Sequence, residues 1–511
     1  MTPAATLPVA VFLLVVLLTN PSPLADRWTG GGRASDTTFA LPTVAAAVGT
    51  NSSVFPGSSL AENLTLGAPL GPLPSAFWGV NYNYAYPDWN NRTIAGFLNE
   101  TPITWIRLPL GNTAYNNTET WRQLATFCGW VHCHSIATVG GPNTTPQQGV
   151  ADVERAVALG IHPDYWVFGN EPDLWPMSGL AYAELVQQWI VGVLAVAPTA
   201  KFLGAEVSGN PKVGDPYIYN VTLLDGPYLS GIGIQLYPQD GGDTPAQFLN
   251  SINSNTSVAS GIKNAQALMS EACPTCTIPI FLGEFNGGSG LNTRYIPFRE
   301  SELNAVVFAA SIVQGLRVGL QQFAPWTLTA LADDKCDLGL IELQPSCDGR
   351  TLNPDFYLYS GLLDHLPMGN LTNASVPGLP FVYALADTLG AQNALLLVNT
   401  NVTVDADIQS NLSSGRCVTT YLEDPAHPGP VETEKWFVPS ANVSDPEPAA
   451  FDLPAEGILV ADYASVPGPC PVGPTGPFGP YAVAVIVGVA LVVGVGAALT
   501  AWLVPGRRRV H

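Results

Sequence analysis

The stretch YWVFGNEPDLW, residues 165–175, decides the fold of this chain. A run of aromatic and β-branched residues stops at Gly169, and Asn170, Glu171 and Asp173 follow. Such a run predicts a buried strand that presents polar side chains at its carboxyl end. Barrels of parallel strands place their chemistry at that end. Glu171 is therefore the first candidate catalytic residue.

A second stretch, IPIFLGEFN at residues 278–286, has the same form. Its apolar run ends at a glycine and then presents Glu284 and Asn286. Taken alone, either strand-end glutamate is as consistent with a salt-bridge or capping residue as with a catalytic one. Two glutamates that each follow an apolar run and a glycine, the first of them within Asn-Glu-Pro, favour a catalytic carboxylate pair.

Short apolar runs alternate with longer segments of helical pattern between residues 76 and 366. The runs are residues 77–82, 103–108, 131–139, 165–168, 201–205, 232–237, 278–282 and 319–326. Eight strand and helix units predict an α/β fold of the closed (β/α)8 TIM-barrel type, with residues 76–366 as its domain. No G-x-G-x-x-G follows the first run, so a dinucleotide site is disfavoured, and we expect neither a cofactor nor a metal.

Both flanks of the barrel are expected to build one accessory β-sandwich. Period-2 strands within residues 367–466 are predicted at 381–386, 394–399, 417–422 and 457–462. The segment of residues 26–75 is rich in Gly, Ser, Thr and Pro and has one strand-like piece, residues 38–48, which could pair into the sandwich.

The two ends of the chain predict a cell-surface protein in the secretory pathway. Residues 1–25 contain the apolar run of a signal peptide. Residues 467–480 form a Pro- and Gly-rich linker, and residues 481–504 carry no charge and predict a transmembrane helix. The basic segment 505–511 then predicts a cytoplasmic tail, so the ectodomain is extracellular and the membrane anchor single-pass. A cleaved lipid-anchor signal is the alternative.

Glycosylation acceptor sequences support secretion. N-x-S/T begins at Asn51, Asn63, Asn91, Asn99, Asn116, Asn143, Asn220, Asn255, Asn370, Asn373, Asn401, Asn411 and Asn442.

The eight cysteines form an even set, which predicts disulfides in an oxidising compartment. Near neighbours predict four pairs, Cys128 with Cys133, Cys273 with Cys276, Cys336 with Cys347, and Cys417 with Cys470. The Cys-Pro-Thr-Cys spacing of the second pair also matches a redox or zinc-knuckle motif, but without a second such motif a loop disulfide is favoured.

The formal net charge of −21, with only 19 Lys and Arg, lacks the electrostatic footprint of a nucleic-acid binder. Polyanionic ligands are also disfavoured at long range, although a local group of donors can still hold one carboxylate. The sequence does not predict an oligomeric state.

Retaining glycoside hydrolysis needs one protonated and one ionised carboxyl group on opposite sides of a glycosidic bond, about 5–5.5 Å apart. Glu171 and Glu284 fit these roles. Asn170 beside the acid is placed to bind the sugar 2-hydroxyl, or is a simple turn residue.

Three more strand ends offer candidate substrate-binding residues. Arg107 lies in a buried-type position, where a charge needs a partner, and the carboxylate of Glu284 is the natural one. Tyr237 could donate a hydrogen bond to Glu284 or be a core tyrosine. Trp326 offers an aromatic face to a sugar ring or is a core tryptophan.

The environments of the two glutamates should differ. If Arg107, Asn286 or Tyr237 stabilises the anion of Glu284, its pKa should stay low. Glu171 faces that anion in an aromatic pocket, which should raise its pKa.

Four motifs carry a resemblance to a known group, IRLPLGNT at residues 106–113, GNEPDLW at 169–175, LGEFNGGSG at 282–290 and NPDFYLYSGLLDHL at 353–366. They resemble the retaining glycosidase clan built on the (β/α)8 barrel, and within it glycoside hydrolase family 79, the β-glucuronidase and heparanase group. The resemblance implies Glu171 as acid/base and Glu284 as nucleophile. It also implies that the Gly-rich loop after Glu284 contacts a uronate carboxylate.

Further substrate-binding candidates lie in or near these motifs. Gly288 and Gly290 could offer backbone N–H groups, Arg294 a charge, and Asn112 an amide. The chain departs from the family pattern at two places, because residues 79–86 contain no acid and strand eight reads QQFAPW without a histidine.

The sequence therefore predicts a retaining β-glycosidase with a carbohydrate substrate, most specifically a β-glucuronide. A β-glycosidase for neutral sugars (glucoside, galactoside or xyloside) is one alternative. A non-catalytic glycan-binding ectodomain on the same barrel is the other.

Overall fold

The computed structural model describes residues 60–82, 92–109, 118–208, 211–238, 244–254, 256–288, 298, 301–330, 339–342, 352–366, 369–389, 392–410, 416–425, 427–438 and 449–464. These residues belong to the unit that begins at Gly57. The predicted signal peptide, the strand-like piece at 38–48, the linker, the transmembrane helix and the cytoplasmic tail lie outside the described residues and stay predictions.

Eight parallel strands form the central sheet, and each pairs with the next in chain order. They are β3 (Gly79–Asn81), β4 (Trp105–Pro109), β5 (His134–Val139), β6 (Tyr165–Phe168), β7 (Phe202–Val207), β8 (Leu229–Leu236), β9 (Ile280–Phe285) and β10 (Gln322–Pro325). A parallel bridge between Trp78 and Phe323 brings the last strand to the first. The predicted barrel is confirmed, and every strand end lies within three residues of its predicted position.

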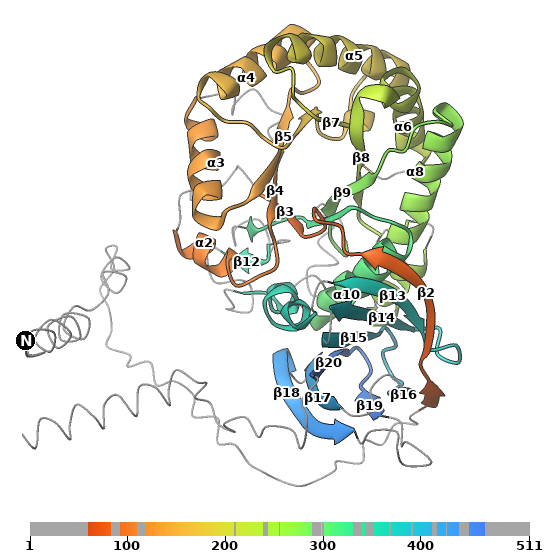
Figure 1. Ribbon diagram of the computed structural model, residues 1–511. Coiled ribbons are helices and arrows are strands. Elements are labelled where there is room, and N and C mark those ends of the chain that lie inside the picture. Colours follow the sequence, from red (N-terminus) through yellow and green to blue (C-terminus); the bar gives the residue numbers. More distant parts are fainter. Residues whose placement is uncertain are drawn as a thin grey trace, which may run out of the picture. The chain divides into compact units, whose positions relative to one another are not determined.

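Helices surround the strands on the outside (Figure 1). They are α2 (Arg92–Leu98), α3 (Thr118–Val131), α4 (Pro146–Ala158), α5 (Gly179–Val196), α6 (Pro211–Asp225), α7 (Pro245–Asn250), α8 (Val258–Ala272) and α10 (Glu302–Arg317). Local sequence sets several starts: Thr145 and Gln148 form a capping box at α4, and the Ser178 hydroxyl accepts from the backbone N–H of Ala181 at α5.

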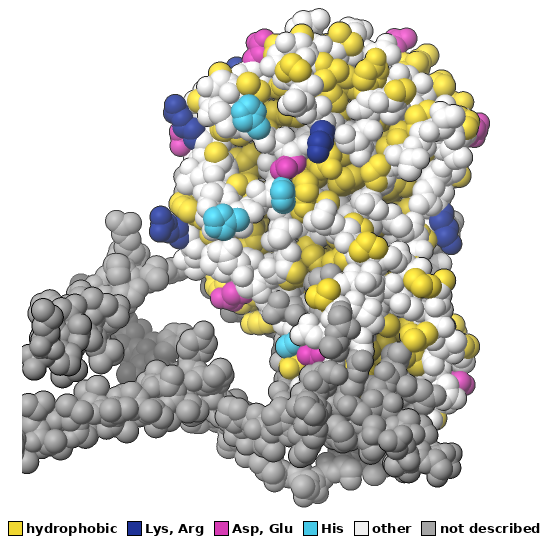
Figure 2. Space-filling model, in the orientation of Figure 1, with side chains coloured by type: hydrophobic (Ala, Val, Ile, Leu, Met, Phe, Trp, Pro, Cys, Tyr) yellow, Lys and Arg dark blue, Asp and Glu magenta, His cyan; other side chains and the backbone are white. Residues whose placement is uncertain are grey.

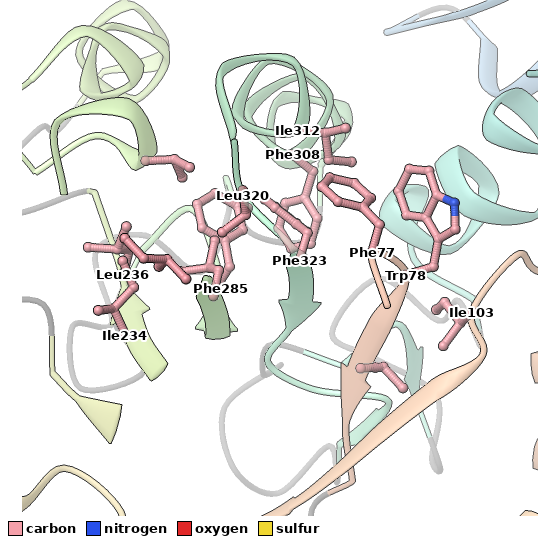
Figure 3. Packing of buried hydrophobic residues seen from close by; sticks show 14 of the residues in the cluster. Phe77, Trp78, Ile103, Ile234, Leu236, Phe285, Phe308, Ile312, Leu320 and Phe323 are labelled. Atoms are coloured by element: carbon pink, nitrogen blue, oxygen red, sulfur yellow. The ribbon is translucent and has the colours of Figure 1, made fainter. Parts of the chain in front are cut away.

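The helix α10 is buried nearly all round, which is typical of a helix with structure on both sides. Its Phe308 packs on Phe285 and Phe323 of the barrel, with ring centroids 4.9 and 5.9 Å apart (Figure 3). At its carboxyl end Arg317 donates through Nη2 to the backbone oxygen of Ala384, at 3.0 Å, in the accessory sheet. The helix therefore joins the barrel to that sheet (Figure 1).

Two further sheets stand beside the barrel. A seven-stranded sheet has the order β18-β17-β20-β15-β14-β13-β2, and a three-stranded sheet has the order β1-β16-β19. Their bounds are β1 (Leu60–Asn63), β2 (Thr65–Pro72), β13 (Asn370–Ser375), β14 (Val382–Leu389), β15 (Gln392–Asn399), β16 (Ala406–Ser410), β17 (Arg416–Asp424), β18 (His427–Val438), β19 (Ala449–Leu453) and β20 (Ile458–Ala464).

One hydrophobic cluster joins the two accessory sheets. It contains Leu395 and Leu397 of β15 together with Ile408 of β16 and Phe451 of β19. The sheets therefore face each other over a common core, as in a sandwich. Strands β1 and β2 precede the barrel in the chain and pair with β16 and β13, so sequence from both flanks contributes.

Short elements complete the described fold. The 3-10 segments η2 (Pro172–Leu174), η3 (Gly226–Tyr228) and η4 (Ser251–Asn253) follow barrel elements. A small pair, β11 (Thr329–Ala330) and β12 (Ile341–Glu342), follows β10. The segment α11 (Pro354–Tyr357), η7 (Leu358–Leu362) and η8 (Leu363–His365) precedes the strand β13.

Two of the four predicted disulfides are present. Cys128 is bonded to Cys133 at the end of α3, and Cys273 to Cys276 after α8. The loop-disulfide interpretation of Cys-Pro-Thr-Cys is therefore confirmed. The other two pairs involve Cys336, Cys347 and Cys470, which lie outside the described residues together with the side chain of Cys417.

In the described part of the chain, α5 is the one helix long and apolar enough to cross a membrane. It packs between α4 and α6 in the ring around the barrel, and its Tyr182 and Trp189 are fully buried. We therefore interpret α5 as a barrel helix.

The barrel interior is layered. Towards the amino ends of the strands, apolar side chains form one cluster, which includes Trp105, Ile136, Val167, Leu203 and Phe281. Such stacked inward-facing layers make a packed core rather than a pore.

A charged layer lies beyond the apolar one, and two glycines make room for it. Arg107 of β4 and Glu206 of β7 form a fully buried ion pair. A Cβ atom on Gly233 of β8 would overlap the side chain of Glu206, and one on Gly283 of β9 would lie 3.0 Å from the Glu206 carboxylate and 3.4 Å from Arg107 Nε. The close approach of these backbones therefore requires glycine.

We predict that Gly233→Ala destabilises the barrel by about 1–3 kcal/mol, because the added methyl group overpacks the layer around Glu206. Gly96→Ala is the matched control. Gly96 lies in α2 with nothing within 4 Å of a new Cβ atom, so alanine should be neutral or stabilise by up to about 1 kcal/mol. Thermal unfolding of both variants measures the difference, and equal melting temperatures would contradict the packing argument.

Candidate active site

Polar side chains gather at the carboxyl ends of the barrel strands. Arg107 lies on β4, Glu171 follows β6, Tyr237 follows β8 and Glu284 lies on β9. The carboxyl ends of parallel strands meet at one end of a barrel, so residues far apart in sequence become neighbours there. The structure thus brings these four predicted residues into one site, where their contacts and electrostatic interactions connect them.

The guanidinium of Arg107 is the centre of this site. It is 1% exposed, and its Nη1 donates to Glu284 Oε1 at 2.8 Å and to Asn81 Oδ1 at 2.6 Å. Its Nη2 donates to Asn170 Oδ1 and pairs with Glu206. The predicted ion pair between Arg107 and Glu284 is therefore present, within a larger network.

Two carboxylates share this one buried cation. Burial alone would lower the pKa of Arg107, but attraction to Glu206 and Glu284 outweighs burial and raises it above its ordinary value. A buried ion that loses its partner destabilises a protein strongly, since the remaining charge is left uncompensated. The positions of the three side chains are therefore interdependent.

Glu284 is held from both sides. It is 5% exposed, with Oε1 on Arg107 and Oε2 accepting from the Tyr237 hydroxyl at 2.8 Å. Burial raises its pKa, while Arg107 and Tyr237 oppose that effect, and the net direction is upward. The prediction of a low pKa for Glu284 is therefore wrong, because desolvation outweighs its two donors.

Tyr237 remains a hydrogen-bond donor throughout the neutral range. Burial and the neighbouring charge of Glu284 raise the pKa of its hydroxyl well above the ordinary value. The interpretation of Tyr237 as a donor to Glu284 is thus the one that the structure confirms.

Glu171 has a different environment. It is partly exposed, and the described residues donate no hydrogen bond to its carboxyl group. Burial, followed by the charges of Glu284 and Asp173, raises its pKa to about 8, so the predicted direction is confirmed. Its side chain is thus mostly protonated at neutral pH.

The backbone at Glu171 is in the left-handed region, with a φ of 46°. Non-glycine residues rarely adopt this conformation, which persists where surrounding structure enforces it. Here the backbone N–H of Glu171 donates to the backbone oxygen of Glu206 at 2.9 Å. The preceding Gly169 also has a positive φ, of 83°. The turn after β6 therefore places Glu171 by backbone contacts rather than by its side chain.

The side-chain amide of Asn170 is held through its oxygen, and its nitrogen can donate to a ligand. Its Oδ1 accepts from Gln235 Nε2 at 2.7 Å and from Arg107 Nη2. With the oxygen occupied, Nδ2 is the half that remains to donate to a ligand hydroxyl. This arrangement is consistent with the predicted contact to a sugar.

Sequence reasoning missed Glu206. The predicted fifth strand ends at residue 205, whereas β7 continues to Val207 and so includes Glu206, although Glu206 also follows an apolar run. The pairing of β7 with β8 shifts register between Gly204 and Val207, and Ala205 has a φ of 46°. This bulge aims Glu206 into the barrel. The signal that could have found it is an acid at the end of a buried strand.

The sequence also did not single out Asn81, because the family resemblance predicts an acid at the end of the first strand. Asn81 is fully buried, and its Nδ2 donates to the backbone oxygens of Gly283 at 2.6 Å and Pro325 at 3.1 Å. It therefore links β3, β9 and β10 while its Oδ1 holds Arg107. Gln235, which fixes Asn170, is the third missed residue.

The remaining candidates differ in their surroundings. Asn286 is buried, donates to the backbone oxygen of Trp326 at 2.9 Å and accepts from Asn304 at 3.2 Å. These bonds tie the end of β9 to the end of β10 and to α10. Trp326 is partly exposed at the end of β10, and Gly288 is buried. Asn112, Gly290 and Arg294 lie outside the described residues.

No family model and no curated protein matches this sequence. Among solved structures the chain is similar to CelM2, a bifunctional glucanase-xylanase from a metagenome library, with a TM-score of 0.57 and 12% identity over 80% of this chain and 100% of that one. It is also similar to the α-L-arabinofuranosidase of Thermotoga maritima, with a TM-score of 0.59 and 12% identity over 79% and 99%.

A third similar structure is the glycoside hydrolase family 30 endoxylanase of Clostridium papyrosolvens, with a TM-score of 0.53 and 14% identity over 80% and 100%. Each of the three matches covers about four fifths of this chain, which is more than the barrel domain of residues 76–366, so the likeness extends beyond the barrel. The chain therefore has the fold of TIM-barrel glycoside hydrolases.

Proposed function

We propose that this protein is a retaining β-glycosidase that uses Glu171 as acid/base and Glu284 as nucleophile. The observation that carries this proposal is that two carboxyl groups at the same end of the barrel differ in their hydrogen bonding and in the causes of their pKa shifts. Glu284 is fixed by Arg107 and Tyr237, whereas Glu171 takes no side-chain hydrogen bond from the described residues and has a pKa of about 8. Paired titratable groups whose environments separate their roles are typical of acid/base sites.

In the first step a carboxylate oxygen of Glu284 forms a bond to the anomeric carbon of the sugar. The bond from that carbon to the glycosidic oxygen breaks, and Glu171 transfers its proton to the leaving oxygen. The products are the free alcohol and a glycosyl ester on Glu284. The hydrogen bonds from Arg107 and Tyr237 keep the attacking group in one orientation.

In the second step Glu171 accepts a proton from water, whose oxygen bonds to the anomeric carbon as the ester bond to Glu284 breaks. The negative charge of Glu284 contributes to the raised pKa of Glu171. Ester formation removes that charge, so the pKa of Glu171 falls and the residue becomes a better base. The same carboxyl group can thus serve as acid first and base second.

The substrate we propose is a β-glucuronide. Support comes from the resemblance of the sequence motifs and from the Gly-rich segment after Glu284, of which Gly287 and Gly288 are described and buried. On the face shown in Figure 2, the Lys and Arg side chains of the described residues stand singly. The whole chain has only 19 Lys and Arg, so the donors for a uronate carboxylate would have to be local, either backbone N–H groups after Glu284 or the charge of Arg294.

A neutral β-linked sugar is the second candidate. The similar structures are named as a glucanase-xylanase, an arabinofuranosidase and an endoxylanase, none of which is named for a uronide. The protein is further proposed to act outside the cell, on the evidence of its sequence ends. A purely glycan-binding role is disfavoured, because binding alone does not need a buried Arg107 shared by two carboxylates.

The substrate class is tested with aryl β-glucuronide, β-glucoside, β-galactoside and β-xyloside and the full-length protein in detergent. We expect the glucuronide to have the highest kcat/KM, by about tenfold or more, as one charge-assisted contact would give. Equal or faster cleavage of the glucoside would establish the neutral-sugar alternative. Cleavage of none of the four would favour the binding protein.

Substitution of the two glutamates should separate their roles. Glu284→Gln should abolish turnover of every substrate, because no covalent intermediate can form. Glu171→Gln should slow substrates with poor leaving groups by about 10²–10⁴-fold and spare the first step for good leaving groups. Glu154→Gln, at an exposed glutamate on α4, is the matched control. Equal losses for good and poor leaving groups in Glu171→Gln would refute the assignment.

The pH profile follows from the same pKa shifts. Glu171 must be protonated for the first step, so kcat/KM should fall as the pH rises through about 8. Glu284 must be ionised, and its raised pKa moves the acid limb above the range of an ordinary glutamate.

Glu206 should act as a positioning residue, and its negative charge contributes to the raised pKa of both Glu171 and Glu284. Glu206→Gln should therefore move both limbs of the profile to lower pH, besides reducing kcat. A lower kcat with unmoved limbs would mean that Glu206 is only structural, and Glu154→Gln should leave the profile unchanged.

A further inference from the structure

A cavity of about 290 Å³ lies where the barrel meets the accessory sheets. Ala246, Asn250 and Asn253 line it from α7 and η4, and Phe381, Thr400 and Asn401 line it from the sheet side. None of the residues of the candidate active site contributes to it. Its lining combines amide groups with one partly exposed aromatic ring.

The barrel wall of the cavity is fixed to the sheet and to α10. The Tyr383 hydroxyl donates to Asn253 Oδ1 at 2.6 Å, and Gln314 Nε2 donates to the backbone oxygen of Ile252 at 2.8 Å. Among the described residues none accepts a hydrogen bond from Asn253 Nδ2, and the exposed side chain of Asn250 makes no hydrogen bond to them.

The sheet wall is equally well ordered. The Thr400 backbone N–H and hydroxyl both donate to the backbone oxygen of Phe381, at 3.0 and 2.9 Å. The buried Asn399 accepts from the Asn401 backbone N–H at 3.0 Å and donates to the backbone oxygen of Pro454 at 2.9 Å. The cavity is thus a built site and not a chance gap between loops.

Asn401 begins the acceptor sequence Asn-Val-Thr. Its Oδ1 accepts three hydrogen bonds, from the Thr403 backbone N–H at 2.9 Å, the Thr403 hydroxyl at 3.2 Å and the Val404 backbone N–H at 3.1 Å. The side-chain oxygen is therefore fully used. No described residue accepts a hydrogen bond from Nδ2, the atom to which an N-linked sugar is attached.

We infer that Asn401 carries an N-linked glycan and that the cavity holds the first sugar of that glycan. Attachment replaces one Nδ2–H bond with a bond from Nδ2 to carbon one of the sugar. The sugar leaves a pyrophosphate-linked donor of the secretory pathway, and the proton passes to solvent. The glycan then bridges the barrel and the accessory sheets by contacts within one chain.

The chemistry of the cavity fits this occupant. Its volume is at the lower end of small-ligand pockets, about 300 Å³, which suits one sugar ring rather than an extended chain. The amide groups of Asn250 and Asn253 can hydrogen-bond sugar hydroxyl and acetamide groups. The ring of Phe381 offers an apolar surface to the C–H face of the sugar. Because the sugar is tethered at Asn401, even weak contacts would be occupied.

This inference depends on passage through the secretory pathway and not on the proposed glycosidase activity. Asn99 is the matched control site. It is an exposed acceptor asparagine that follows α2 and does not line the cavity. Occupancy at Asn99 reports passage through the secretory pathway alone. It can therefore be separated from the docking of a sugar in the cavity.

The test uses full-length protein from a eukaryotic secretory host. Site-specific mass spectrometry should find Asn401 occupied, with loss of the glycan in Thr403→Ala and retention in Thr403→Ser. In the folded protein, a peptide N-glycosidase should release the Asn401 glycan about tenfold or more slowly than the Asn99 glycan, which corresponds to ~1.4 kcal/mol of contact energy. After denaturation the two rates should be equal.

Filling the cavity should remove the protection. Ala246→Trp places a large ring where the sugar is proposed to lie, so release from Asn401 should approach the rate at Asn99, whereas Ala246→Ser should behave as wild type. Phe381→Leu removes the aromatic face without adding volume and should also speed release, which keeps the test decisive if Ala246→Trp does not fold.

Three outcomes would overturn the inference. An unoccupied Asn401 beside an occupied Asn99 would exclude the modification. Equal release rates in the folded wild type would exclude the docked sugar, and so would protection that persists in both Ala246→Trp and Phe381→Leu. Absence of glycan at every acceptor site would remove the secretory premise and the inference together.

Discussion

The buried ion pair network of Arg107 is the interaction on which the site depends. One buried guanidinium in the barrel is shared by Glu206 of β7 and Glu284 of β9. Removing either carboxylate would leave buried charge poorly compensated, which in other proteins destabilises by about 3–5 kcal/mol. The barrel accommodates the network because Gly233 and Gly283 supply no side chains at the points of closest approach. The same residues therefore determine both the packing of the barrel interior and the position of Glu284.

This network also makes the two site glutamates different. Glu284 is oriented by Arg107 and Tyr237, but it lies so deep that burial still raises its pKa. Glu171 is positioned through its backbone and faces a net negative set of carboxylates, which together with burial raises its pKa to about 8. Burial and the excess of acid over base around Arg107 together keep a proton on Glu171 at neutral pH, which is what the proposed role of general acid requires.

The sequence predicted the barrel well because buried parallel strands are continuous apolar runs, and Glu171, Glu284 and Arg107 stand out against them. Glu206 was missed because it lies one residue beyond the predicted strand, and the bulge that turns its side chain inward has no clear sequence signal, although an acid at the end of a buried strand was there to be seen. The accessory strand β2 was missed because its sequence, TLGAPLGP, is largely exposed and lacks alternation, so its pairing with β13 decides its structure. The bonds of Asn286 to Trp326 and Asn304 depend on tertiary contacts that no local pattern encodes.

The accessory sheets contact the site indirectly, through the residue next to Glu284 and the helix α10. Phe285 directly follows Glu284, and its ring packs on Phe308 of α10 and Phe323 of β10, at 4.9 and 4.7 Å between centroids (Figure 3). The opposite side of α10 packs on β14 and β15. Close-packed interiors transmit small displacements rather than absorb them. The sheets that flank the barrel therefore help to hold the backbone of Glu284 in register, which gives a physical reason for the barrel and its accessory sheets to form one structural unit.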